Sequence, residues 1–343
     1  MLRCLRRGFV GNGARAKELE ERIRLRTGRK YAFAVLSGFH ALFLAVRALD
    51  LTPGSRVCLP VLTCASVLAA VQNAGHRAVL ADIEAVTLTL DVKGVPEGCA
   101  AIIAPHGYGA PVDAEAVQRI GLLWIEDCAT SPATTVGGRP AGAGGTLAVF
   151  SFASTKYVTG GSGGVLVCDD DRLATRVQDL LDVDSFNKSG EWKNGWSGAL
   201  PGRMADLNAS LALAQLDRMG EIAFRRREIA GRYNERLQDV PGLKLPTLTP
   251  EHSVYRYIVR TETPSKGISA RLRYLGIDAP TSVNPFLDRI PSTMGRVEGG
   301  PWPVADSWRE HLLSLPIHPS MSDGQVELVA DSLRVAMTVG DVT

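Results

Sequence analysis

The sequence lacks several features that would assign it at once to a class of protein. It has no apolar run of membrane-spanning length, and its basic opening MLRCLRRGFVGNG has no apolar core like that of a signal peptide, so no membrane partner is predicted. The net charge is only +2 at pH 7, which argues against a nucleic-acid surface or an acidic tail. No internal repeat or low-complexity segment is present.

The common cofactor and metal motifs are missing as well. No GxGxxG follows a predicted strand and no GxxxxGKS/T occurs, which removes the main support for dinucleotide-binding and P-loop proteins. HExxH spacing is absent and the six histidines are scattered, so no metal site is predicted. The cysteines form no CxxC pair, and reduced thiols in a cytoplasmic protein are expected. They are Cys4, Cys58, Cys64, Cys99, Cys128 and Cys168.

Lysine is scarce, and one lysine has an unusual setting. Eight of the 38 basic residues are lysine, and Lys156 lies in LAVFSFASTKYVTGGSGGVLV, residues 147–167. This stretch predicts a strand over Leu147–Phe152, a polar turn, a glycine cluster and a second apolar strand. Because a buried ammonium is costly unless it is paired or neutralised, Lys156 either extends to water or belongs to a functional site. In such a site a neutral lysine can attack a carbonyl and form a Schiff base.

What the sequence does contain is a regular alternation of strands and helices. With 45% hydrophobic residues, 35 glycines and 19 prolines, the composition is that of a globular α/β enzyme. The predicted strands are nearly continuous apolar runs, which is typical of a mostly parallel central sheet covered by helices. Strands are expected at 31–36, 56–60, 77–82, 99–104 and 122–126, and helices at 14–26, 39–50, 64–74 and 112–120.

A change of character after Pro246 predicts a smaller second domain. The segment SVYRYIVRT is predicted to be a strand, and residues 268–275 and 323–336 are predicted helices. Ser322 and Gln325 have the spacing of a capping box at the start of the last helix. We therefore expect a large α/β domain, residues 1–240, and a smaller C-terminal α+β domain, residues 241–343.

Two polar stretches precede that second domain. Residues 184–202 contain Trp192 and Trp196, which either line a substrate mouth or pin a loop. Residues 204–237 are predicted to be helical with a break near Gly220, and RRRE at 225–228 is predicted to be a solvated face.

Several polar residues stand where predicted strands end. Functional groups gather at the carboxyl ends of parallel strands, so one of Glu126 and Asp127 is expected to point into a site, with a helix cap as the alternative. Ser37 and Gly38 open a helix, either as an anion-binding turn or as an ordinary strand-to-helix turn. His106 is interpreted as a structural hydrogen-bonding residue at a turn in preference to a catalytic base.

The order of these motifs is informative. A Ser-Gly helix start, a strand ending in Glu-Asp, FSF followed by a lysine and glycines, and LSLPIHPSMSDGQVELV occur in one sequence. In this the chain resembles the nucleotide-sugar aminotransferases of the DegT/DnrJ/StrS group, which are pyridoxal-phosphate enzymes of fold type I. The resemblance runs from GNGARAKELEERI to the last helix, and VFSFASTKYVTGGSGGVLV is its most specific part.

The resemblance implies roles for individual residues. Lys156 matches the family's Schiff-base lysine, which also moves a proton between the substrate carbon and the cofactor. Asp127 matches the aspartate that pairs with the pyridine nitrogen of pyridoxal 5'-phosphate and keeps the ring an electron acceptor. Ser151 and the amides of Gly38 and Phe39 match the phosphate cradle, because helix-start amides suit a phosphate dianion.

Four positions depart from the family's pattern. Phe39 stands for the threonine that usually follows Ser-Gly, and Cys64 stands where an aromatic residue commonly stacks on the cofactor ring. Thr130 replaces the glutamine or histidine that approaches the cofactor's phenolic oxygen, and Pro201 replaces an asparagine that reaches the partner subunit's phosphate. Each change is expected to weaken a cofactor contact by about 1 kcal/mol.

The resemblance therefore implies a cytoplasmic, homodimeric aminotransferase that transfers an amino group from glutamate to a keto-sugar nucleotide, in amino-sugar biosynthesis for a surface polysaccharide or a natural product. Three alternatives stay open. They are another reaction of the same cofactor, an unusual acceptor such as a cyclitol, and a catalytically weak relative that binds cofactor or sugar nucleotide as a regulatory partner. Dehydratase relatives carry histidine in place of the lysine, so Lys156 argues against them.

Overall fold

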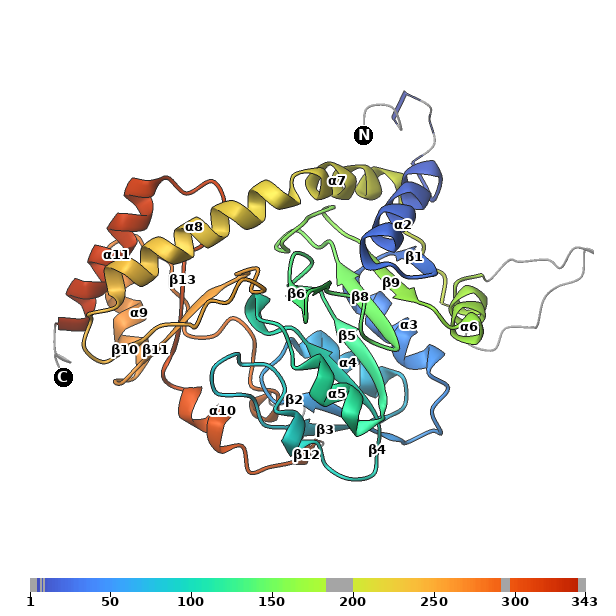
Figure 1. The fold of residues 1–343 in the computed structure, drawn as a ribbon, viewed down its shortest axis with the longest axis horizontal. Helices are drawn as coiled ribbons and strands as arrows, with labels where there is room; N and C mark the ends of the chain where they lie inside the picture. The colour runs from blue at the N-terminus through green and yellow to red at the C-terminus, as the bar shows by residue number, and fades with distance from the viewer. Residues whose placement is uncertain (1–4, 7, 9, 183–199, 291–296, 339–343) are drawn as a thin grey trace, which may run out of the picture.

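An eight-stranded sheet forms the centre of the computed structural model, which describes residues 5–6, 8, 10–182, 200–290 and 297–338. The strand order is β1-β9-β8-β5-β4-β2-β3-β12 (Figure 1). Its strands are β1 (Tyr31–Val35), β2 (Arg56–Pro60), β3 (Arg77–Ala81), β4 (Cys99–Pro105), β5 (Leu123–Asp127), β8 (Leu147–Ser151), β9 (Gly164–Cys168) and β12 (Glu298–Gly299).

Most of the sheet is parallel. From β8 through β5, β4, β2 and β3 to β12 each pair of neighbours is parallel, whereas β9 is antiparallel to both β1 and β8. The register pairs Pro105 with Asp127 and Asp127 with Val149, so β4, β5 and β8 end side by side. The predicted mostly parallel α/β sheet is confirmed.

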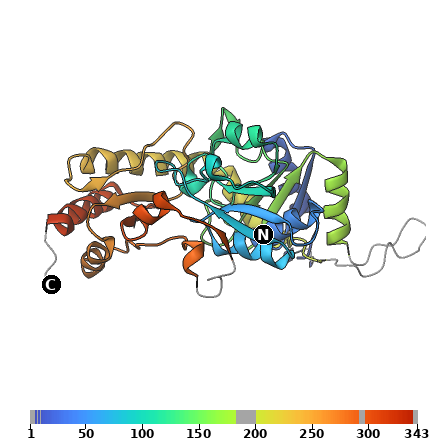
Figure 2. The same cartoon turned by 90° about the horizontal axis from the view of Figure 1, so that it is seen from below.

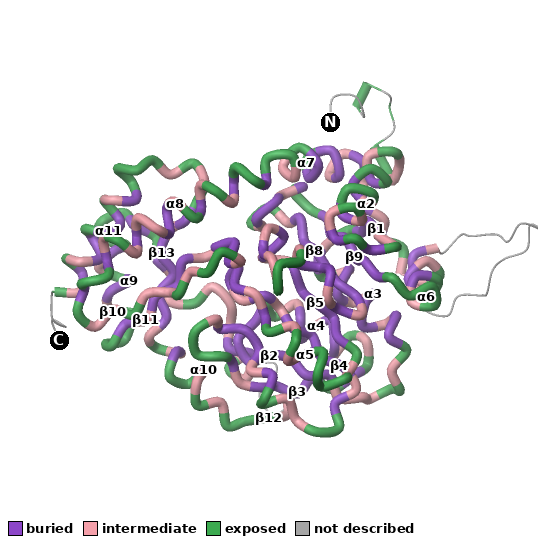
Figure 3. The backbone as a smooth tube through the Cα atoms, viewed as in Figure 1, coloured by how far each residue is buried: buried purple, intermediate pink, exposed green. Residues whose placement is uncertain are grey.

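Helices cover both faces of this sheet, and the residues of its strands are therefore mostly buried (Figure 3). Along β8, Leu147 and Val149 belong to one hydrophobic cluster and Ala148 and Phe150 to another, as the alternation of a strand requires. The first face packs against α3 (Gly38–Ala48), α4 (Ala65–Asn73) and α6 (Asp171–Leu181). The second face packs against α2 (Ala14–Thr27), α5 (Ala114–Ile120) and α7 (Asp206–Asp217).

The C-terminal part has its own small sheet and hydrophobic cluster. Strands β10 (Leu243–Lys244), β11 (Tyr257–Thr261) and β13 (Leu312–Leu315) form an antiparallel sheet. It packs with α8 (Met219–Leu237), α9 (Ser265–Tyr274) and α11 (Asp323–Thr338) on the side of the molecule away from α6, as Figures 1 and 2 show. The predicted α+β part is thus present. The predicted capping box forms, since the Gln325 amide donates to Ser322 Oγ over 3.2 Å and the Ser322 amide to Gln325 Oε1 over 3.0 Å.

Two features link this part to the large sheet. Helix α8 extends from α7 to α11, and the chain returns to the large sheet in β12 and α10 (Pro303–Trp308). The Asp82 carboxylate after β3 accepts from the Val304 and Ala305 amides at the start of α10, each over 2.9 Å. A division of the chain at residue 240 stays a proposal. A short hairpin, β6 (Thr135–Val136) and β7 (Arg139–Pro140), completes the described strands.

Two of three local predictions need correction. The helical stretch breaks at Arg218, between α7 and α8, two residues before Gly220, where the break was predicted. Arg226 in the RRRE run is only 7% exposed, because one residue of four consecutive helical positions faces the interior. The strand predicted from residue 253 begins at Tyr257, since Val254 has a left-handed φ of 54°.

Two further predictions concern a pair of tryptophans and membrane-spanning segments. Trp192 and Trp196 lie outside the described residues. No helix within the described ranges combines the length and the apolarity needed to cross a membrane.

Candidate active site

Asp127 and Lys156 lie close together at the carboxyl end of the parallel strands. Asp127 ends β5 and is 5% exposed, and Lys156 is half-buried in the turn that follows β8. Burial raises the pKa of the Asp127 carboxyl, while the Ala129 amide, 2.9 Å from Oδ1, and the charge of Lys156 act in the opposite direction. Asp127 is therefore a buried carboxylate whose ionised form depends on a nearby cation.

The start of α3 and the end of β8 meet beside this pair. A Cβ atom at Gly38 would lie 2.5 Å from Ser151 Cβ, so only glycine allows the helix start to approach Ser151 this closely. Ser37 caps α3, its Oγ accepting from the His40 amide over 3.1 Å. The first amides of a helix have no acceptor within the helix, and those of Gly38 and Phe39 belong to the first turn of α3, next to Ser151.

The residues that depart from the family pattern have other partners. Phe39 is 37% exposed and stacks on Phe43 with 6.2 Å between ring centroids. Cys64 caps α4 and is exposed, with its Sγ 2.9 Å from Ser66 Oγ. Thr130 Oγ1 donates to the carbonyl of His106 over 3.1 Å. Phe39 therefore lies next to Gly38 at the start of α3, and Thr130 lies just after the end of β5. Among the described residues, no hydrogen bond or ion pair joins Cys64 to Lys156 or to Asp127.

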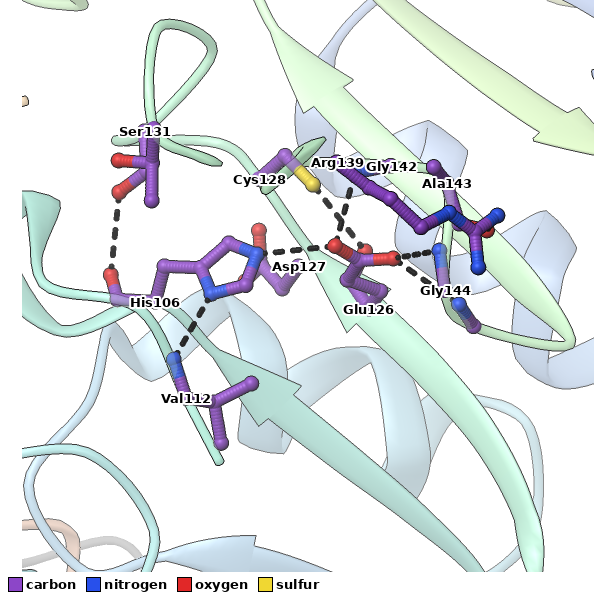
Figure 4. A network of polar contacts seen from close by, with 12 residues as sticks. His106, Val112, Glu126, Asp127, Cys128, Ser131, Arg139, Gly142, Ala143 and Gly144 are labelled. Atoms are coloured by element: carbon purple, nitrogen blue, oxygen red, sulfur yellow. Dashed lines mark hydrogen bonds and ion pairs between the residues drawn. The ribbon is translucent and has the colours of Figure 1, made fainter. Parts of the chain in front are cut away.

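Glu126 points to the opposite face of the sheet from Asp127, because neighbouring residues of a strand alternate (Figure 4). Its Oε1 lies 3.0 Å from His106 Nε2 and 2.8 Å from the Gly142 amide, and its Oε2 lies 2.9 Å from the amides of Gly144 and Gly145. Burial by itself would raise the pKa of Glu126, but His106 and the glycine amides lower it to about 2. The Glu-Asp pair thus sends one carboxylate to each face of the sheet.

His106 completes this network as a neutral ring. Its Nδ1 accepts from the Val112 amide over 3.1 Å, so the ring carries its proton on Nε2 and donates it to Glu126. This geometry agrees with the hydrogen-bonding interpretation of His106. Cys128 lies nearby, and ligand atoms of the three residues are within 4.8 Å of one another. Because His106 and Glu126 already use these atoms in hydrogen bonds, and burial raises the pKa of the Cys128 thiol, the trio supports β5 and offers no open metal site.

We expect Glu126→Gln to lower the free energy of unfolding by a few kcal/mol at pH 7, since a pKa unit corresponds to roughly 1.4 kcal/mol. The lowered pKa means that the carboxylate stabilises the fold above its ordinary pKa of 4.5, and that this contribution is lost as the pH falls toward about 2. Urea denaturation at a series of pH values should show the difference between wild type and variant shrinking over that range. The exposed Glu310→Gln is the control, and a difference independent of pH would contradict the prediction.

A model of the DegT/DnrJ/EryC1/StrS aminotransferase family matches residues 1–334. The chain belongs to this family. This aminotransferase is 31% identical to the spore coat polysaccharide biosynthesis protein SpsC of Bacillus subtilis (strain 168), over 96% of the chain and 91% of SpsC. The predicted family and the predicted aminotransferase class are thus confirmed.

Two solved structures support the same assignment. The structure of DesV from S. venezuelae is 29% identical, with a TM-score of 0.90 over 99% of this chain and 94% of DesV. That of DesI, determined in the presence of its TDP-sugar product, is 28% identical, with a TM-score of 0.89 over 98% of this chain and 88% of DesI. The fold predicted from the sequence, a fold type I α/β domain with an α+β C-terminal part, is confirmed.

Proposed function

We propose that this aminotransferase uses pyridoxal 5'-phosphate to transfer an amino group from glutamate to a keto-sugar nucleotide. The observation that carries the proposal is that the buried Asp127 ends β5, that Lys156 lies in the turn after the neighbouring strand β8, and that Gly38 approaches Ser151 at the end of β8. Membership of an aminotransferase family supports the reaction class. The TDP-sugar product of DesI and the polysaccharide pathway of SpsC support a nucleotide sugar as acceptor.

The residues present fit this cofactor. Ser151 and the amides of Gly38 and Phe39 would hold the phosphate, and the absent side chain of Gly38 gives the phosphate close access to the helix start. Asp127 would pair with the protonated ring nitrogen. The positive charge on that nitrogen would lower the pKa of the Asp127 carboxyl, which burial raises. When bound, the protonated ring accepts the electron pair released as the substrate carbon loses its proton.

The chain's own residues then have distinct tasks. Lys156 would hold the cofactor through Nζ, and the same atom would take and return the proton at the substrate carbon. Asp127, which is 5% exposed, would supply the negative charge that keeps a proton on the ring nitrogen. Glu126 and His106 bond to each other on the other face of β5 and support that strand.

Half-reactions test the proposal directly. The purified protein with pyridoxal phosphate should show a yellow absorption band that glutamate bleaches and a keto-sugar nucleotide restores. Borohydride reduction followed by peptide mapping should place the cofactor on Lys156. An adduct on another lysine, or none, would reject the proposal and leave the regulatory binding protein as the alternative. A band that glutamate bleaches but that no keto-sugar nucleotide restores would reject only the acceptor.

We expect Ser151→Ala to weaken the affinity for pyridoxal phosphate about tenfold or more, because a lost charge-assisted hydrogen bond corresponds to roughly 1.5–3 kcal/mol. Ser151 ends β8 and is 7% exposed, next to Gly38. Equilibrium titration of the cofactor measures the effect. Ser154→Ala, in an exposed position of the same turn, should leave the affinity unchanged. Equal affinities of wild type and Ser151→Ala would show that the hydroxyl has no role in phosphate binding.

A homodimer in the cytoplasm is also part of the proposal. Leu36 and Phe39 are 52% and 37% exposed beside the start of α3, and a second copy of the chain would remove this apolar surface from water. The described cysteines, residues 58, 64, 99, 128 and 168, are free thiols, as is usual in a reducing compartment. Light scattering at micromolar concentration should report a dimer, and a stable monomer with full activity would contradict it.

A further inference from the structure

Tyrosine hydroxyls hold the backbone on both sides of Lys156. Tyr255 Oη donates to the carbonyl of Thr155 over 3.0 Å, and Tyr157 Oη donates to the carbonyl of Ser253 over 3.2 Å. Both rings are buried, with 7% and 3% exposed. The lysine therefore lies between two residues that are each bonded to the segment 253–256, which leads into β11 of the small sheet.

The segment 253–256 is itself bonded to the turn that follows β4 of the large sheet. The Ser253 amide donates to the carbonyl of Gly109 over 3.0 Å, and the Tyr255 amide donates to the carbonyl of Tyr108 over 2.8 Å. A Cβ atom at Gly109 would lie 2.7 Å from the nitrogens of Val254 and Tyr255, so this approach requires glycine. Val254 has a φ of 54°, a conformation that is rare for a β-branched residue and persists only where its surroundings impose it.

Arg226 on α8 joins the two bonded parts. Its Nη1 donates to the carbonyls of Val254, Tyr255 and Ile317 over 3.4, 3.0 and 3.2 Å, and its Cζ lies 5.0 Å from the ring centroid of Tyr157. The side chain is 7% exposed, burial lowers its pKa, and within the described ranges it has no carboxylate partner. A buried cation without a counter-ion is costly, so this arrangement is retained against a stability cost.

We propose that Tyr157 and Tyr255 are positioning residues for Lys156, an inference that rests on the proposed function. Besides the two tyrosine bonds, the Lys156 amide donates to Ala153 over 3.0 Å, the Gly160 amide donates to Phe152 over 2.8 Å, and Asn208 Nδ2 donates to the carbonyl of Gly160 over 2.8 Å. Each hydroxyl restrains the backbone of one neighbour of Lys156 and so limits where the lysine amine can reach. A misplacement of about 1 Å at a reacting group lowers a rate by as much as roughly a hundredfold.

The test uses Tyr157→Phe, Tyr255→Phe and the double variant. Each single change removes one oxygen atom and keeps the ring, so the fold is expected to persist, which circular dichroism and the melting temperature verify. We expect kcat to fall about tenfold or more with KM within about twofold, because the hydroxyls act on the lysine and not on substrate binding. Tyr233→Phe is the matched control, since the buried Tyr233 donates to the carbonyl of Pro316 over 2.8 Å, in the hydrophobic cluster of the small sheet.

A second readout needs neither cofactor nor turnover. Hydrogen–deuterium exchange of residues 153–160 should be faster at the Lys156 and Gly160 amides in the two single variants than in wild type or Tyr233→Phe. If neither the exchange rates nor kcat change, the proposal is overturned, whatever happens to the melting temperature. If wild type fails to transaminate, the proposed function fails, whereas the exchange experiment still decides whether the tyrosines restrain the turn.

Discussion

Lys156→Ala is expected to lower the rate of transamination by roughly ten-thousandfold or more, the upper range for removal of a group that transfers the reacting proton. The amine of Lys156 is proposed both to attach to the cofactor and to move the proton, and alanine removes both tasks at once. Its neighbours, a threonine and a tyrosine, have no amine that could attach to an aldehyde. Single-turnover formation of 2-oxoglutarate from glutamate measures the effect, because the variant has no lysine amine with which to form the yellow band.

Two further variants separate the amine from its charge. Lys156→Arg keeps a positive charge but stays protonated at all accessible pH values, so we expect it to be as inactive as the alanine variant. Lys93→Ala, which removes an exposed lysine of the large domain, should retain full activity. Substantial turnover by Lys156→Ala would show that another base carries the reaction.

Asp127→Asn is expected to lower kcat by roughly a hundredfold or more, the effect of removing one preorganised electrostatic group. An amide has the shape of the carboxylate and can still accept from the Ala129 amide, but it has no charge with which to keep a pyridine nitrogen protonated. The lysine should still attach to the cofactor. Comparison of kcat with the yield of borohydride adduct therefore distinguishes slow proton transfer from lost attachment.

The same substitution should stabilise the cofactor-free protein. Burial raises the folded-state pKa of Asp127 above its ordinary value of 3.8, so stability contributed by this group is lost as the pH rises through the folded-state pKa. Asparagine cannot ionise and avoids this loss. A melting temperature at neutral pH that is higher for Asp127→Asn than for wild type would show that stability is given up for function at this position. A lower melting temperature would contradict the prediction.

The sequence predicted the large sheet closely because its strands are continuous apolar runs between turns. Residues 56–60 were predicted as a strand with the bounds that β2 has. General rules predicted only that one of Glu126 and Asp127 faces a site at the carboxyl ends of the strands, and the choice of Asp127 together with Lys156 required the resemblance to a family. The proximity of Gly38 to Ser151 required the resemblance to a family, because the two residues are far apart in the chain and neither is distinctive alone.

The contacts between the two sheets could not be predicted in this way. Four charged residues in a row at 225–228 indicate a solvated face, and only the packing of α8 shows that Arg226 points inward to three carbonyls. The sequence SVYRYIVRT predicts one strand from residue 253, yet the carbonyls of Val254 and Tyr255 bond to Arg226 and the amides of Ser253 and Tyr255 bond to residues 108 and 109. A tyrosine directly after the lysine was the one local signal of this arrangement.

The return of residues 298–308 to the large sheet has a consequence for how the chain is made. Strand β12 pairs with β3 at the edge of the sheet. The Asp82 carboxylate can cap α10 only after residues 304 and 305 have been synthesised. A nascent chain that has emerged from the ribosome only as far as residue 240 would expose the unpaired edge of β3 and lack the apolar side chains of Phe286, Leu287, Ala305 and Trp308 that complete its core. Exposed edges promote association between chains, so the growing polypeptide is most in need of a chaperone during synthesis of its last hundred or so residues.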